Sequence, residues 1–222
     1  MHLLTYLTHT SMVIANCART AMRSSLRIIT PAALIVLLSL LAACEAEEPT
    51  REDSPEMITT VVVTFTPVGG GVAITGKAVD PDGDGIRNIE SDGPLKLKAG
   101  ATYQLTLLMY NDLAAHDSDQ YEISAEVKNE ADEHMLFFGW TNNLFSNPSG
   151  NGNIDSRDDA VLYEDEDDHG LPLGLVTQWT TATPSTGVLR ILLKHQPDLK
   201  SETSTADIGE SDLDVVFDIE VN

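Results

Sequence analysis

Histidine and acidic side chains are the residues of this 222-residue chain with the clearest potential for chemistry. Imidazole is the commonest side-chain ligand for transition-metal ions. His134 follows a run of acidic residues, and His195 follows an apolar stretch. No pair of histidines has a ligand spacing such as His-x-x-x-His, so a metal site would need residues that the fold brings together. The alternative is that each histidine lies on the surface or makes an ordinary hydrogen bond.

A second candidate site is the loop Asp80-Pro81-Asp82-Gly83-Asp84-Gly85. Its alternating carboxylates and its final glycine match the opening of a calcium-binding loop, in which a tight turn directs alternate oxygens to one cation. The match then ends, because Ser91 stands where a bidentate glutamate should close the shell. Asp-Gly pairs are also typical of hairpin turns. A calcium site at Asp80, Asp82 and Asp84 and a plain β-turn therefore both remain open, and we favour the turn.

Catalytic motifs are missing from the sequence. It contains no Gly-x-Ser-x-Gly, Ser-x-x-Lys or His-Glu-x-x-His, and no glycine pattern for phosphates or dinucleotides. The acidic runs 155–159 and 164–168 are typical of solvated loops. We therefore expect that the protein is not an enzyme.

The first 43 residues read as a lipoprotein signal peptide. Arg23 and Arg27 precede the apolar stretch 32–40, and small residues then lead to Cys44. A cysteine in this position is acylated, with fatty acids such as palmitate, and becomes the new N-terminus after cleavage. We expect a lipid anchor at Cys44, and Met22 is an alternative start of the same signal.

The expected mature protein is strongly acidic. The whole chain has 13 basic and 35 acidic side chains, and residues 1–43 hold three of the basic and none of the acidic ones, which leaves a mature charge of −25. Such a surface repels phosphate backbones, so we expect no nucleic-acid partner. It also repels anionic lipids, so contact with the membrane must depend on the acyl anchor. The second cysteine, Cys17, leaves with the signal, and the mature chain therefore has no disulfide.

Residues 44–58 predict an acidic, flexible tether. The acidic pair Glu47-Glu48 shortly after Cys44 resembles the surface-export signal of some Gram-negative lipoproteins. We therefore expect an outer-membrane lipoprotein of the cell envelope. Exposure on the cell surface and a periplasm-facing position are both left open.

Period-two alternation of apolar and polar residues predicts strands through residues 59–222. Turn signals recur at short spacing, and no alternation of strands with helices appears. This pattern is typical of an antiparallel β-sandwich, immunoglobulin-like or similar. The predicted strands are 60–66, 72–79, 103–110, 135–140, 161–163, 175–180, 188–193 and 215–221.

One segment breaks the β pattern. Asp117-Ser118 can cap a helix over 119–133, with acidic residues in its first turn. Its apolar residues fall near one stripe, as expected for a helix that covers a sheet or closes its end. His134 would then lie at the helix C-terminus, where the helix dipole favours a protonated imidazole.

Several short motifs carry a resemblance to a known family. They are Asp80–Gly85, Glu130–His134 before Phe137-Phe138, Gly170–Leu175 before Trp179-Thr180, Ser185–Gly187, Leu189-Arg190 and His195–Pro197. With these motifs the chain resembles small bacterial lipoproteins labelled, loosely, "type 1 periplasmic binding fold superfamily protein". The similarity spans nearly all of the mature domain. A type 1 periplasmic binding protein has two α/β lobes, which about 180 residues with one helix cannot build, so the all-β prediction stands.

The resemblance also bears on function, because the family motifs include both His134 and His195. Together with Asp132 or Glu133, this pair would suit zinc or copper. We therefore carry two hypotheses. One is a non-enzymatic envelope module that binds a ligand or a partner such as an uptake receptor; the alternative is a metal-binding or metal-delivery lipoprotein. Imidazole nitrogens within about 4 to 5 Å of each other would favour the alternative, because they could share one ion.

Overall fold

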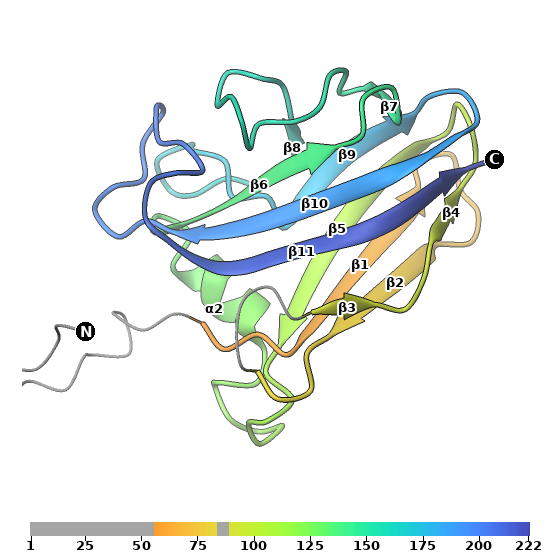
Figure 1. The fold of residues 1–222 in the computed structure, drawn as a ribbon. Helices are drawn as coiled ribbons and strands as arrows, with labels where there is room; N and C mark the ends of the chain where they lie inside the picture. The colour runs from red at the N-terminus through yellow and green to blue at the C-terminus, as the bar shows by residue number, and fades with distance from the viewer. Residues whose placement is uncertain (1–55, 84–88) are drawn as a thin grey trace, which may run out of the picture. The chain divides into compact units, whose positions relative to one another are not determined.

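The computed structural model describes residues 56–83 and 89–222, which form a sandwich of two β-sheets (Figure 1). The predicted fold class is thereby confirmed. The predicted signal peptide with its alternative start at Met22, the lipidated Cys44 and the tether up to residue 55 lie outside the described residues, as does Asp84. No helix in the described ranges is long and apolar enough to cross a membrane.

The first sheet has the strand order β3-β2-β1-β5-β9-β7, and β8 also pairs with β9. All of these neighbours are antiparallel. The strands are β1 (Thr60–Pro67), β2 (Ile74–Val79), β3 (Glu90–Ser91), β5 (Thr102–Tyr110), β7 (Phe145–Asn147), β8 (Leu162–Tyr163) and β9 (Val176–Thr181).

The second sheet has the order β4-β11-β10-β6. Its long strands are antiparallel, and β4 pairs with β11 in parallel. The strands are β4 (Leu95–Leu97), β6 (His134–Trp140), β10 (Ser185–His195) and β11 (Glu210–Val221). Figure 1 shows β6, β10 and β11 running side by side across the domain, so the start of β6 lies next to the end of β10 and the start of β11.

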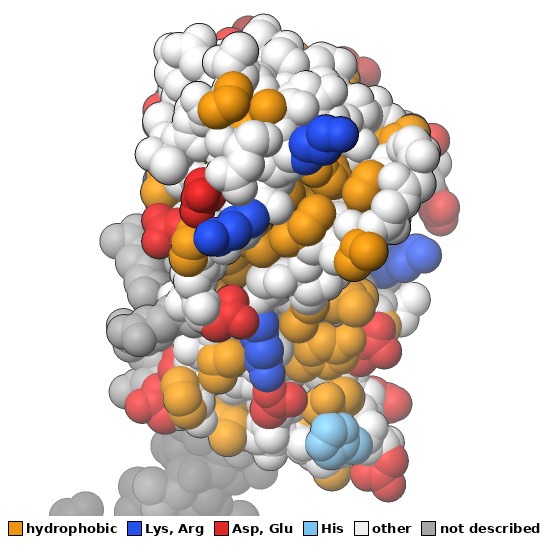
Figure 2. Space-filling model, turned by 90° about the vertical axis from the view of Figure 1, so that its right-hand side faces the viewer, with side chains coloured by type: hydrophobic (Ala, Val, Ile, Leu, Met, Phe, Trp, Pro, Cys, Tyr) orange, Lys and Arg blue, Asp and Glu red, His pale blue; other side chains and the backbone are white. Residues whose placement is uncertain are grey.

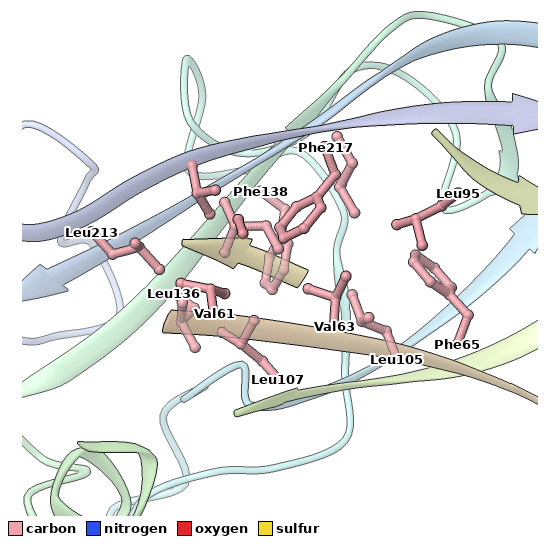
Figure 3. Packing of buried hydrophobic residues seen from close by; sticks show 14 of the residues in the cluster. Val61, Val63, Phe65, Leu95, Leu105, Leu107, Leu136, Phe138, Leu213 and Phe217 are labelled. Carbon is pink, nitrogen blue, oxygen red and sulfur yellow. The ribbon is translucent and has the colours of Figure 1, made fainter. Parts of the chain in front are cut away.

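The core lies between the two sheets, where alternate residues of each strand point inward (Figure 3). Each large apolar side chain buried in this way contributes roughly 1.5–3 kcal/mol to folding, which makes this layer the main source of stability. Ile58, the last residue assigned to the tether, is also buried in this core. Residues labelled in Figure 3 that belong to the core include Val61, Val63, Phe65, Leu105 and Leu107 from the first sheet and Leu136, Phe138, Leu213 and Phe217 from the second.

The eight predicted strands are all present. Strands β3, β4 and β7 were not predicted, because two or three residues carry no readable period. The strand predicted at 188–193 extends to Ser185–His195, and the last strand begins at Glu210. His195 is the last residue of this strand, as the sequence predicts.

The predicted helix over 119–133 is too long. The observed helix, α2, spans Ile123–Asn129, and its N-cap residue Glu122 makes no side-chain cap. The backbone N–H of Asn111, the residue after β5, donates to the carbonyl of Tyr121 at 2.9 Å, and this hydrogen bond takes the carbonyl that a longer helix would use. Residues 130–133 form a turn that leads into β6, so the last predicted helical turn is absent.

The solvent face of the domain carries charges of both signs. Figure 2 shows one face, on which hydrophobic side chains lie between basic and acidic ones. Large apolar side chains that remain exposed include Leu108, Leu113 and Val216. The acidic side chains behind the net charge of −22 are therefore not spread uniformly over this face.

Candidate metal centre

Three neighbouring strands of the second sheet bring two histidines and one aspartate together. His134 begins β6 and is directly opposite His195, the last residue of β10. Directly opposed residues on antiparallel strands have adjacent side chains. The two imidazole rings are stacked, with centroids 4.7 Å apart and planes 11° from parallel.

The third member, Asp212, comes from an irregularity in β11. Leu213 pairs with Leu193, but the next pair along is Ser211 with Lys194, so Asp212 has no partner on β10. A bulge of this kind re-aims a side chain and is common beside functional sites. Asp212 and Leu213 are consecutive and both buried, which simple alternation forbids. The bulge therefore turns the Asp212 carboxylate toward the histidines.

The protonation of His134 follows from its hydrogen bond. Its Nδ1 lies 3.1 Å from the backbone carbonyl of Glu130, which can only accept, so Nδ1 carries the proton. The neutral ring then has its lone pair on Nε2. This Nε2 is buried, has no hydrogen-bond partner among the described residues, and lies 3.7 Å from the nearest oxygen of Asp212. Metal-bound histidines typically donate the other ring N–H to a carbonyl or carboxylate in this way.

His195 is oriented by a carboxylate. Its Nε2 lies 3.3 Å from Glu133, whose side chain is 33% exposed. With Nε2–H donating to this carboxylate, a neutral His195 keeps its lone pair on Nδ1. Both imidazoles of the site are thus held by a second group, one by a backbone carbonyl and one by an acidic side chain.

Burial sets the charge states of the site. It lowers the pKa of His134 to about 4, although the Glu130 carbonyl favours the protonated ring. This overturns the sequence-based expectation of a protonated His134, because the helix end lends less stabilisation than burial removes. Burial also raises the pKa of Asp212 to about 6, against His195 and the backbone N–H of Glu56. At neutral pH the site therefore presents a neutral imidazole to an ionised carboxylate.

The His-His-Asp triad (His134, His195 and Asp212) fits a transition-metal ion. One ligand atom from each residue lies within 4.8 Å of the other two, and all three residues are buried. Ligands bound tetrahedrally to zinc at roughly 2.0–2.2 Å are about 3.4 Å apart, so side-chain movements of about 1 Å would close the triad on one ion. Two nitrogens and one carboxylate suit zinc or copper, whereas calcium and magnesium prefer oxygen ligands.

A second group of possible ligands shares His134. Carboxylate oxygens of Glu56 and Glu130 and a nitrogen of His134 lie within 4.8 Å of one another. Glu56 lies four residues before β1, and Glu130 is the C-cap residue of α2; both are half-buried. The triad is thus bordered by acidic side chains that reach solvent.

Of the predicted metal ligands, the structure brings His134, His195 and Glu133 together. Asp132 belongs to neither group of ligand atoms. It lines a cleft on the other side of the turn formed by residues 130–133. Asp212 was missed, because the alternation of Asp214, Asp218 and their apolar neighbours assigns it to the solvent face. No feature of the sequence marks the bulge that brings it inward.

The calcium-like loop has a local structural role at its first residue. Asp80 is buried, and its Oδ1 accepts the backbone N–H groups of Asp82 and Gly83 at 3.4 and 3.3 Å. This is the aspartate-stabilised turn that competes with the calcium interpretation. Asp82 is exposed, and Asp84 lies outside the described residues.

A cleft of about 640 Å³ lies next to the turn 130–133, and Ala131 and Asp132 line it. Its floor is apolar, with Leu107, Leu173 and Leu175, and it is bounded by α2, β5 and the acidic segment 165–168. Asp132 lies at this cleft, so the turn 130–133 separates it from the triad.

Comparison with known proteins adds no relative: no protein family, curated protein or solved structure matches the chain. The interpretation therefore depends on the geometry of the site.

Proposed function

We propose that the protein is a bacterial outer-membrane lipoprotein, anchored through an acylated Cys44, whose β-sandwich binds one zinc or copper ion at His134, His195 and Asp212. The role is non-enzymatic: the domain holds the ion and hands it on within the cell envelope. The signal sequence supports the anchor, and the geometry of the triad supports the metal.

The Nε2 atom of His134 is the observation that supports the metal most strongly. It carries a lone pair in a fully buried side chain, and the Asp212 carboxylate 3.7 Å away also offers only lone pairs at neutral pH. An unsatisfied buried acceptor costs roughly 1–3 kcal/mol. A proton or a cation between the two groups would remove this cost. The raised pKa of Asp212, about 6, lets a proton do so in acid, and a cation can take that place at neutral pH.

Isothermal titration with Zn²⁺ and Cu²⁺ tests this proposal on the full lipidated chain, purified in detergent and freed of metal. One ion should bind per chain. The double variant His134→Ala, His195→Ala should lose more than about 100-fold in affinity, beyond what removal of a supporting residue costs. The matched control is His116→Ala, His169→Ala, which removes two exposed histidines and should bind as the unaltered protein does. Absence of binding heat, or equal binding by the two double variants, would refute the proposal.

The cleft supports a second function, the binding of a partner segment. Its apolar floor is bordered by Asp132, Glu166 and Asp168, and Lys128 is the one lysine that lines it among the residues that the structure describes. Charge complementarity therefore favours a segment with alternating basic and apolar side chains, such as one from an uptake receptor. A fluorescent Lys-Leu peptide should bind more tightly than its Glu-Leu counterpart, and the triple variant Asp132→Asn, Glu166→Gln, Asp168→Asn should remove the preference. Equal binding of both peptides would exclude this occupant.

A further inference from the structure

The His-His-Asp triad is almost closed to solvent in the described structure. The side chains of His134 and Asp212 are fully buried, and that of His195 is 9% exposed. An ion that reaches the triad must therefore pass groups that contact both solvent and the buried ligands. A metal site needs such a route as much as it needs its ligands.

Glu56 and Glu130 meet this requirement. Their carboxylates lie within 4.8 Å of a nitrogen of His134 and of each other, and both residues are partly exposed. They come from two elements that close the same end of the sandwich, the segment before β1 and the end of α2. His134 therefore belongs to an exposed oxygen-rich group and to the buried nitrogen-rich triad.

Glu56 contacts both groups. Its side chain belongs to the outer group, while its backbone N–H is one of the groups that favour the ionised form of Asp212. Glu130 is likewise connected twice, because its backbone carbonyl holds the Nδ1 proton of His134. The two residues that could receive an ion thus also position the inner ligands.

We propose that Glu56 and Glu130 form a transfer site through which a divalent cation passes to and from the His-His-Asp triad, with His134 shared between the two. This inference rests on the proposed metal-binding function. Two carboxylates raise the rate at which a hydrated cation arrives, but their affinity for it is low. The imidazoles of the triad have a higher affinity for zinc or copper. The unpartnered Nε2 of His134, 3.7 Å from Asp212, is the atom that would receive the ion within the triad.

Stopped-flow measurement of zinc uptake tests the transfer site, with a zinc-sensitive dye as the competing chelator and the full lipidated chain in detergent. The variant Glu56→Gln, Glu130→Gln should take up and release zinc about tenfold more slowly, because local negative charge accelerates association by this order. Its equilibrium affinity should stay within about threefold, since the inner ligands are unchanged.

The matched control is Asp218→Asn, Glu220→Gln. It removes the same charge from β11 at a point that begins about 20 Å from Asp212 along the strand. This control should change the uptake rate by less than about twofold. If the Glu56/Glu130 double variant fails to fold, as judged by circular dichroism, the two single variants take its place, each with an expected slowing of about threefold.

The outcomes separate this inference from the proposed function. If the unaltered chain binds no zinc, the proposed function fails. If it binds zinc, and the Glu56/Glu130 variant matches the Asp218/Glu220 control in rate, the transfer site alone fails. A loss of affinity of more than about tenfold in the Glu56/Glu130 variant also overturns it, because the two carboxylates would then be ligands of the final site.

Discussion

Two buried polar clusters lie on either side of the turn 130–133, and they are built in opposite ways. In the first, Lys200 lies 2.8 Å from Asp167, with both side chains 1% exposed, and it also donates to the carbonyl of Ala131 at 2.6 Å. In the second, the His-His-Asp triad, a neutral imidazole faces a carboxylate and neither supplies a proton.

This difference is why we assign the first cluster to the fold and propose a ligand for the second. Buried charges are normally matched, and Lys200 and Asp167 match each other. The ammonium of Lys200 and neighbouring N–H groups hold the pKa of Asp167 below its ordinary value even though burial acts in the opposite direction. In the triad, Nε2 of His134 has no such match among the described residues, and an unsatisfied buried group in a native structure calls for an explanation such as a functional site.

The largest expected effect comes from breaking the matched cluster. Lys200→Met should lower the free energy of unfolding by about 3–5 kcal/mol, because Asp167 is left as a buried charge without its partner. Urea unfolding at pH 7 measures this loss. The double variant Lys200→Met, Asp167→Asn should recover more than half of it, since Asn still accepts the N–H groups of His169 and Leu171. A loss below about 1 kcal/mol in the single variant would show that the pair does not hold this region.

The next effect comes from the triad and depends on pH. The pKa of His134 falls from 6.5 to about 4 on folding, so the unfolded chain binds its proton more tightly and stability decreases as the pH drops from 6.5 to 4. The pKa of Asp212 rises from 3.8 to about 6, so stability decreases as the pH rises through that range. In the metal-free protein these two slopes oppose each other and nearly cancel.

The variant Asp212→Asn should reveal the pH dependence of stability that His134 alone produces. In urea unfolding without metal, the free energy of unfolding of the variant should rise by about 3 kcal/mol more than that of the unaltered protein between pH 4 and pH 6.5. At pH 7 it should be the more stable of the two, because it no longer buries an unmatched carboxylate. Parallel stability curves for the two proteins across this pH range would contradict the charge states assigned to the triad.

The smallest effect is expected at the calcium-like loop. Asp80→Asn should cost about 1 kcal/mol or less, because the amide oxygen still accepts the backbone N–H groups that Asp80 accepts. Millimolar Ca²⁺ should leave the unfolding temperature of the unaltered protein unchanged. A rise in that temperature that is absent in Asp80→Asn would restore the calcium interpretation.

The sheets could be predicted from the sequence because their strands are long and alternate regularly. Val61, Val63 and Phe65 define the inner face of β1, and Phe217, Ile219 and Val221 define that of β11. The predicted helix was too long, because acidic residues and an apolar stripe predict helix well before Ile123. The hydrogen bond between Asn111 and Tyr121 excludes the helix from that stretch. Local sequence does not record such a tertiary pairing.

The candidate site could be predicted only in part. His134 and His195 were identified through the motifs of the resemblance, and the register of β6 and β10 brings them together. Asp212 could not be found, because its inward direction depends on a one-residue slip between β10 and β11. Since the side-chain period of a strand is two, such a slip reverses the face that a residue occupies.

X-ray diffraction from crystals of the protein soaked in Zn²⁺, with data collected on both sides of the zinc absorption edge, tests the central claim most directly. The account predicts one dominant anomalous peak, within about 2.0–2.2 Å of a nitrogen of His134, a nitrogen of His195 and an oxygen of Asp212. Peaks confined to exposed histidines or acidic loops, with none between these three side chains, would contradict it.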